Sequence, residues 1–261
     1  MRKFFPFVLL VQWLLSWAPA ATMYPGSELS FSGVSFDYSR VRFTSATGES
    51  GADASLNGDT LTVAFGSFGG SAAPADFSFD YATTHIGLRI QAIDSFIADL
   101  TILAQGTYSV EAPVADSWAS VIGSIPFSMQ VLGVNGIPYT GTDLSRSASL
   151  SMNPSSVSIN FPGSALDQNN QPIPGSGTWT AQWTITGIAS TLAGVFQLGA
   201  GQNITELDVA VTPDINTAAG GTGTGTVTMD QIQFTPTPEP SSLALVGLAG
   251  WALLASRRRR R

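Results

Sequence analysis

Cysteine is absent from the 261-residue chain, and histidine and lysine occur once each, as His85 and Lys3. The lack of cysteine excludes disulfides, thiolate zinc sites and iron–sulfur clusters. A Ser-His-Asp triad would have to use His85, and no Gly-x-Ser-x-Gly elbow in the sequence presents a serine nucleophile. Lys3 lies at the extreme N-terminus, which leaves no lysine nucleophile in the body of the chain. We therefore expect a protein that is not an enzyme and needs no cofactor.

Basic residues are scarce in the middle of the chain. Residues 21–235 contain only four: Arg40, Arg42, Arg89 and Arg146. Of the 18 acidic residues only Glu239 lies outside this segment, which therefore carries a net charge of −13. Such a body repels nucleic acid and anionic lipid surfaces, so we expect no nucleic-acid partner.

The first 20 residues have the three parts of a secretory signal peptide. Arg2 and Lys3 precede a short apolar run, which ends in small residues at Ala18 and Ala20, the −3 and −1 positions of a cleavage site. We predict cleavage by signal peptidase after Ala20. The alternative is an uncleaved membrane anchor, although the run is shorter than the roughly 20 residues that span a bilayer.

Apolar residues alternate with polar ones in many short runs between residues 21 and 235. Examples are Phe77, Phe79 and Tyr81, and also Trp179, Ala181, Trp183 and Ile185. This period of two predicts strands that are covered on one face. The pairs Asn57-Gly58 and Asn135-Gly136 separate such runs and suit tight hairpin turns. We predict an all-β body over residues 21–235, an antiparallel β-sandwich of jelly-roll type.

Three segments depart from this pattern. Residues 86–104 carry apolar residues at helical spacing, but the same residues also fit two strands that turn near Asp94-Ser95, and we favour the strands. Residues 162–177 are rich in proline and residues 213–225 are rich in glycine. Both are predicted to be exposed loops that sustain no strand pairing.

The body offers few side chains with binding or catalytic chemistry. Asp167 with Asn169, and Asp214 with Asn216, place oxygen ligands in the two predicted loops, where a structural calcium ion is the metal that fits. The carboxylate pairs Asp76/Asp80 and Glu206/Asp208 suit glycoside hydrolysis in principle, but equally a solvated strand face.

Three tryptophans of the body have two interpretations. Trp118, Trp179 and Trp183 form either part of the core or a platform on which sugars stack. Trp179 and Trp183 share a strand face with Ala181 and Ile185, which favours the core for these two.

Residues 236–261 form a tail of three parts. Pro238, Glu239 and Pro240 belong to a run of alternating prolines, which indicates an exposed, extended spacer. An uncharged segment follows over 243–255, long enough for about 20 Å of helix. The chain then ends in five arginines: Arg257, Arg258, Arg259, Arg260 and Arg261. We predict a short C-terminal transmembrane helix with these arginines as its cytoplasmic stop.

This order of elements resembles the PEP-CTERM sorting signal of Gram-negative bacteria. The resemblance covers only residues 238–261 and implies that Pro238, Glu239 and Pro240 are recognised by exosortase, an integral-membrane protease-transpeptidase. It further implies passage through the inner membrane and delivery to the cell surface or biofilm matrix. A plain tail anchor behind a proline-rich stalk is the alternative.

The resemblance assigns no role to the body. For an exported body without catalytic residues we predict a structural or adhesive function. A carbohydrate-binding module for extracellular polysaccharide is the first rival, and a glycan-active enzyme using paired carboxylates is the second.

Overall fold

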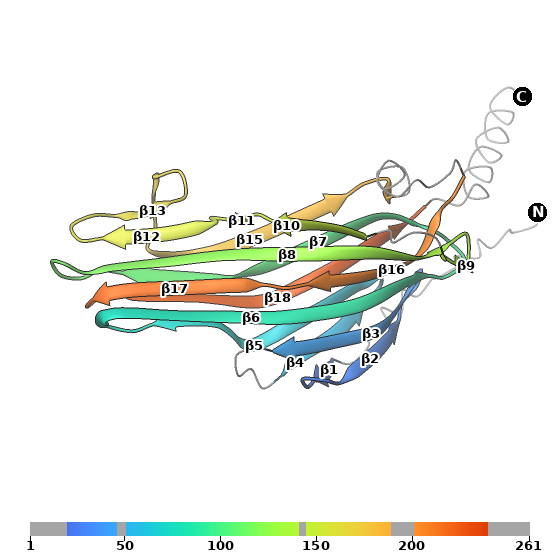
Figure 1. Ribbon diagram of the computed structural model, residues 1–261, viewed down its shortest axis with the longest axis horizontal. Coiled ribbons are helices and arrows are strands. Elements are labelled where there is room, and N and C mark those ends of the chain that lie inside the picture. Colours follow the sequence, from blue (N-terminus) through green and yellow to red (C-terminus); the bar gives the residue numbers. More distant parts are fainter. Residues whose placement is uncertain (1–19, 46–50, 141–144, 189–200, 240–261) are drawn as a thin grey trace, which may run out of the picture.

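Alternating apolar residues build most of the described chain into strands. The computed structural model describes residues 20–45, 51–140, 145–188 and 201–239, which form two sheets packed face to face in an elongated sandwich (Figure 1). Every strand pairing among these residues is antiparallel. The predicted all-β antiparallel body is confirmed.

One layer is a sheet of seven strands, counted over the described residues. Their spatial order is β1 (Ala21–Met23), β4 (Ala52–Asn57), β5 (Thr60–Ala72), β18 (Thr224–Pro238), β7 (Ile97–Glu111), β15 (Ser176–Ile185) and β11 (Met152–Asn153). Strands β5, β18, β7 and β15 are its long central strands, so the last strand before the tail lies in the middle of this layer.

The other layer has eleven strands among the residues described. Eight follow one another in the order β14 (Pro172–Ile173), β13 (Ala165–Asp167), β12 (Ser156–Asn160), β8 (Trp118–Val134), β16 (Ile204–Val211), β6 (Ala75–Ala92), β3 (Phe36–Ser45) and β2 (Glu28–Ser32). The remaining three pair with β8 or β6: β9 (Ile137–Pro138), β10 (Ser145–Leu150) and β17 (Asp214–Gly221).

The core lies between the two sheets and is made by the inward side of each alternation. Ile102 and Phe234 from the first sheet and Ile86 and Val209 from the second are fully buried. Burying one such side chain contributes about 1.5–3 kcal/mol, so the alternation supplies the main driving force for the fold. A single hydrophobic cluster runs through the described body.

The turns that the sequence indicates are confirmed. Strand β6 ends at Ala92 and β7 begins at Ile97, with Asp94 at a positive φ of 51° in the turn between them, so residues 86–104 form strands and not a helix. Asn135 and Gly136 both have positive φ and connect β8 to β9. Gly58 has a φ of 60° in the turn between β4 and β5.

The prediction of exposed loops is wrong for residues 213–225. Residues Asp214–Gly221 form β17, which lies between β6 and β8 and continues the course of β16 along the same two neighbours. Its inward side chains Ile215, Thr217 and Ala219 are buried. In residues 162–177 the short strands β13 and β14 pair at the sheet edge, so this segment is also not free of pairing.

The long strands give the body two distinct ends. At the end that we call the tail end, β18 stops at Pro238 beside the turn from β6 to β7. At the far end, drawn on the left of Figure 1, β18 begins at Thr224 and β8 begins at Trp118. Strand β18 spans about 45 Å between them at the usual rise per residue.

Candidate functional site

Four aromatic side chains gather on the outer face of the second sheet at the far end. Phe77, Phe79 and Tyr81 of β6 are 66%, 56% and 50% exposed, respectively. Trp118 joins them from β8, with its ring centroid 6.1 Å from that of Phe77. Phe79 and Tyr81 are stacked along β6, at 6.3 Å. We call these four residues the aromatic strip.

A glycine lets the indole of Trp118 lie close over β17. Gly220 of β17 is paired with Trp118, and a Cβ at this position would come within 2.2 Å of Trp118 Nε1. The indole therefore covers the backbone of β17 and bridges the gap between β8 and β6. The result is a largely exposed apolar surface, of the kind that marks interaction sites on soluble proteins.

Hydroxyl and amide groups border the aromatic strip, and the Asp214 carboxylate lies beside one of them. Phe79 lies opposite Ala218 of β17, and Ala218 lies opposite Ser120 of β8. Across β12, Ser158 lies opposite Ser120 and Asn160 lies opposite Trp118. Asn216 lies opposite Tyr81 and donates from Nδ2 to Asp214 Oδ1 at 3.2 Å. Flat rings bordered by hydroxyl and amide groups can stack on the apolar face of a sugar and bond to its hydroxyls.

The two other predicted tryptophans belong to the interior. Trp179 is 1% exposed. Trp183 is partly buried against the core, with its ring centroid 4.4 Å from that of Phe127. The core interpretation is confirmed for this pair, and Trp118 is the one of the three that lies on the surface strip.

The two predicted calcium-ligand pairs lie in different surroundings. Asp167 Oδ1 accepts the amides of Asn169 and Gln171 at 2.8 and 2.9 Å, so it closes the turn between β13 and β14. These amides lower the pKa of the Asp167 carboxyl below its ordinary value of 3.8. Asp214 and Asn216 instead lie in β17, bonded to each other. The described residues contain no cluster of three metal-binding side chains. Calcium binding stays a prediction.

One carboxylate of each predicted pair, Asp80 and Glu206, is engaged in a structural contact. Asp80 lies on the side of β6 away from the aromatic strip, where its Oδ2 accepts the amide of Ser71 in the other sheet at 2.8 Å. Asp76 is exposed. Glu206 forms an ion pair with Arg89 at 3.2 Å, and Asp208 lies opposite Arg89 in the pairing of β16 with β6.

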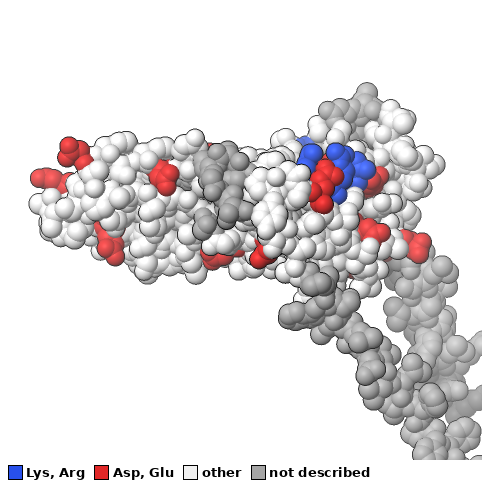
Figure 2. Space-filling model, turned by 90° about the horizontal axis from the view of Figure 1, so that it is seen from below, with Lys and Arg blue, Asp and Glu red and all other residues white. Residues whose placement is uncertain are grey.

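Two basic side chains, Arg42 and Arg89, lie on the tail-end half of the same outer face. Figure 2 shows the basic side chains visible from one side collected in one place, with acidic side chains among them and others scattered elsewhere. Arg42 lies across Gly87, close to His85 and Asp208. Burial lowers the pKa of His85 below its ordinary value of 6.5, Arg42 adds to this, and Asp208 opposes it. The outer face is thus aromatic at the far end and charged nearer the tail end.

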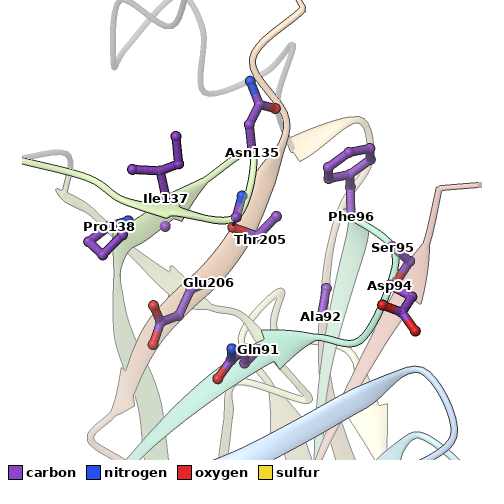
Figure 3. A pocket seen from close by; sticks show the side chains of 12 residues that line it. Gln91, Ala92, Asp94, Ser95, Phe96, Asn135, Ile137, Pro138, Thr205 and Glu206 are labelled. Carbon is purple, nitrogen blue, oxygen red and sulfur yellow. Dashed lines mark hydrogen bonds between the residues drawn. The ribbon is translucent and has the colours of Figure 1, made fainter.

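An open pocket of about 440 Å³ lies at the tail end (Figure 3). It is lined by the turn after β6, the turn from β8 to β9 and the start of β16, including Gln91, Phe96, Asn135 and Glu206. Figure 3 shows Glu206 and Gln91 on neighbouring strands at its floor, with Phe96 on the opposite wall. Its polar surface includes two carboxylates, Asp94 and the ion-paired Glu206, together with side-chain amides.

Of the predicted sorting residues, Pro238 and Glu239 are described. Strand β18 pairs with β7 to its last residue, with Thr237 opposite Asp99 and Pro238 opposite Ile97. This pairing runs beyond residue 235, where the sequence predicts the spacer to begin. Pro240, the segment 243–255, Arg257 to Arg261 and Ala18 lie outside the described residues. Ala20 is exposed just before β1. Within the described ranges no helix is long and apolar enough to cross a membrane.

Comparison with protein families identifies the tail. Residues 236–261 match the PEP-CTERM protein-sorting motif. The C-terminal tail is a PEP-CTERM sorting motif. It implies export and membrane-associated sorting, and its first four residues, 236–239, are the ones that the structure describes.

Other comparisons reach only distant proteins. No curated protein matches the chain. Among solved structures, TmCBM61 in complex with β-1,4-galactotriose is similar at 8% identity and a TM-score of 0.23, covering 75% of this chain and 88% of its own. The mannan-recognising module TmCBM27 is similar at 12% identity and a TM-score of 0.16, covering 85% of this chain and 99% of its own. Likeness this distant carries no conclusion about the body.

Three of the four residues of the aromatic strip are not among the binding residues that the sequence predicts. Phe77, Phe79 and Tyr81 share one face of a predicted strand, and large aromatic residues favour the covered face. The structure turns them outward. The available signal was the alternation of Ile86, Leu88 and Ile90, because these buried residues lie on the side of β6 opposite to Phe77, Phe79 and Tyr81.

Proposed function

We propose that this protein is exported, processed by exosortase at its PEP-CTERM sorting motif, and displayed at the cell surface or in the biofilm matrix of a Gram-negative bacterium. There its β body acts without catalysis as an adhesive element that holds extracellular polysaccharide on the aromatic strip. Signal peptidase removes residues 1–20, and the inner membrane holds the chain only until the tail is cut.

One observation carries this proposal: the aromatic strip and the sorting motif lie at opposite ends of the body. Strand β18 begins next to Trp118 and ends in the motif, about 45 Å away. A tail held in a membrane therefore leaves the strip at the end that faces outward. The negative charge of the body makes a neutral polysaccharide the best-suited partner, because it adds no charge to be repelled.

Affinity electrophoresis tests the adhesive role. The protein is run through gels that contain the matrix polysaccharide of the host or a neutral β-linked glucan, galactan or mannan. Retardation is expected for the wild-type protein and should be lost in Trp118→Ala and weakened in Phe79→Ala. Tyr24→Ala is the matched control, because Tyr24 is an exposed aromatic residue outside the strip. Retardation that persists in Trp118→Ala would assign binding elsewhere, and no retardation with any glycan would leave the passive structural role.

Intact mass tests the sorting role. The protein recovered from its host is compared with a variant in which Pro238, Glu239 and Pro240 are all alanine. The wild-type chain should lack residues 1–20 and the tail beyond the motif, whereas the variant should keep its tail. A wild-type chain that retains residues 243–261 would show a plain membrane anchor and remove exosortase as a partner.

A further inference from the structure

The first residues of the sorting motif are held in the folded body. After Thr235 the chain stays paired with β7, with one register shift between Thr237 and Pro238, and the amide of Glu239 donates to the carbonyl oxygen of Phe96 at 3.0 Å. Pro236 is buried and Glu239 is half-buried. The motif therefore begins inside the first sheet and not on a free spacer.

Alternating prolines allow this pairing on one side only. Neighbouring residues of a strand point their amides in opposite directions, so Thr237 and Glu239 face β7 while the nitrogens of Pro236 and Pro238 face away. On that other side, the pairing of β5 with β18 ends at Leu61 and Phe234. The prolines thus lie where no donor is needed, which is the position that sheets tolerate.

Asp99 fastens the same residues through its side chain. Its Oδ2 accepts the hydroxyl of Thr237 at 2.9 Å, and its Oδ1 accepts the amide of Gly187 at 2.7 Å. One carboxylate therefore ties the end of β18 to the segment that follows β15. Hydrogen bonds to a charged acceptor are among the stronger ones in proteins.

An enzyme that binds an extended peptide commonly does so by pairing with its backbone. The exposed side of the docked motif lacks amide donors at 236 and 238, and its donor side is occupied by β7. We propose that the sorting motif is latched to the body, and that exosortase can take it up only after residues 236–239 separate from Phe96 and Asp99. The latch rests on the proposed processing of the tail. It makes Asp99 a residue that sets the rate at which exosortase processes the tail.

Pulse–chase labelling in the host, read by the loss of tail mass, tests the latch. Asp99→Ala should be processed roughly fivefold faster than the wild-type chain, the factor that corresponds to about 1 kcal/mol of lost hydrogen bonding. Asp53→Ala is the matched control, because Asp53 also accepts a threonine hydroxyl, that of Thr22, but at the edge of the sheet. Equal rates for Asp99→Ala and wild type would overturn the latch.

A disulfide provides the opposite test. Thr237 and Asp99 are direct partners in the strand pairing, so Thr237→Cys with Asp99→Cys can be joined in a chain that has no other cysteine. Membranes of the host should leave the oxidised protein uncut and process it once it is reduced. Processing of the oxidised protein at the wild-type rate would overturn the latch but leave sorting intact. Failure to process even the wild-type chain would instead remove the proposed function.

Discussion

The indole of Trp179 donates from Nε1 to the carbonyl oxygen of Thr228 at 3.0 Å, which joins β15 to β18 across β7. Gly106 of β7 lies between them, and a Cβ there would come within 2.8 Å of the Trp179 ring. The largest side chain of the core therefore fits because its neighbouring strand has no side chain at that point. This contact ties together β15, β7 and β18, and β18 is the strand that leads into the tail.

Replacing Trp179 should strongly destabilise the body. Trp179→Ala removes a fully buried ring and leaves the Thr228 carbonyl without its donor, so we expect the free energy of unfolding to fall by about 3–5 kcal/mol. Urea denaturation measures the change. Trp118→Ala is the control: its ring lies on the surface, and its loss should cost less than about 1 kcal/mol. Equal losses for the two variants would contradict the assignment of Trp179 to the core and Trp118 to the surface.

Gly220 should control the position of Trp118. Gly220→Ala places a methyl group where the indole now lies, so the ring must swing away from the sheet. We expect greater quenching of tryptophan fluorescence by acrylamide and weaker retardation in polysaccharide gels. Gly66→Ala is the control, because nothing lies within 4 Å of a Cβ at Gly66. Unchanged quenching in Gly220→Ala would show that the ring does not rest on β17.

Alkaline pH should destabilise the fold through Tyr38. Burial raises the pKa of Tyr38 far above its ordinary value of 10.0, with Asp59 adding to the effect. The neutral phenol is therefore favoured in the folded state, and its contribution is complete below pH 10 and is lost as the pH rises further. Unfolding free energy should fall by up to about 1.4 kcal/mol per pH unit above about pH 10.

Tyr38→Phe separates this effect from general alkaline denaturation. The variant loses the hydrogen bond from the hydroxyl to the Asp59 carbonyl, so it should be less stable than wild type at pH 8 by about 1 kcal/mol. Its stability should then fall less steeply above pH 10, where Tyr108, whose pKa burial also raises, still contributes. A variant as pH-sensitive as the wild-type protein would exclude Tyr38 as the cause.

Acid should weaken the turn that Asp167 closes. The amides of Gln171 and Asn169 hold the pKa of this carboxyl below 3.8, so its contribution is present above that pH and is lost as the pH falls through the lowered pKa. Asp167→Ala should therefore lower the melting temperature at pH 7 but make little difference near about pH 2. A melting-temperature difference that persists undiminished in acid would assign the effect to something other than the carboxylate.

The sequence predicts those parts of the fold that depend on local alternation. The apolar side chains of residues 86–104 fit strands, and Asp94 supplies the positive φ that the turn needs. Strand β17 could not be predicted in this way, because alanine and glycine have weak strand preference. It exists because β6 and β8 flank it and because Trp118 covers Gly220, which are contacts between residues far apart in the chain.

The end of β18 is another part of the fold that the local sequence does not predict. Proline counts against a strand, so residues 236–240 indicate a spacer when taken alone. The structure needs amides only at every second residue there, because β5 no longer pairs on the other side. Strand β5 begins at Thr60, and this start determines which side of β18 stays unpaired. The sequence of the tail contains no information about the start of β5.

The central position of β18 determines how the body would bear a load. A ligand held at the far end and a tail held at the other end would pull along the strand direction. The hydrogen bonds between β18 and its neighbours β5 and β7 lie across that direction, so they would be loaded together in shear and not broken one after another. Such a body resists stretching along its axis best, whereas a sideways pull at Glu239 would peel the end of β18 away from β7 one bond at a time.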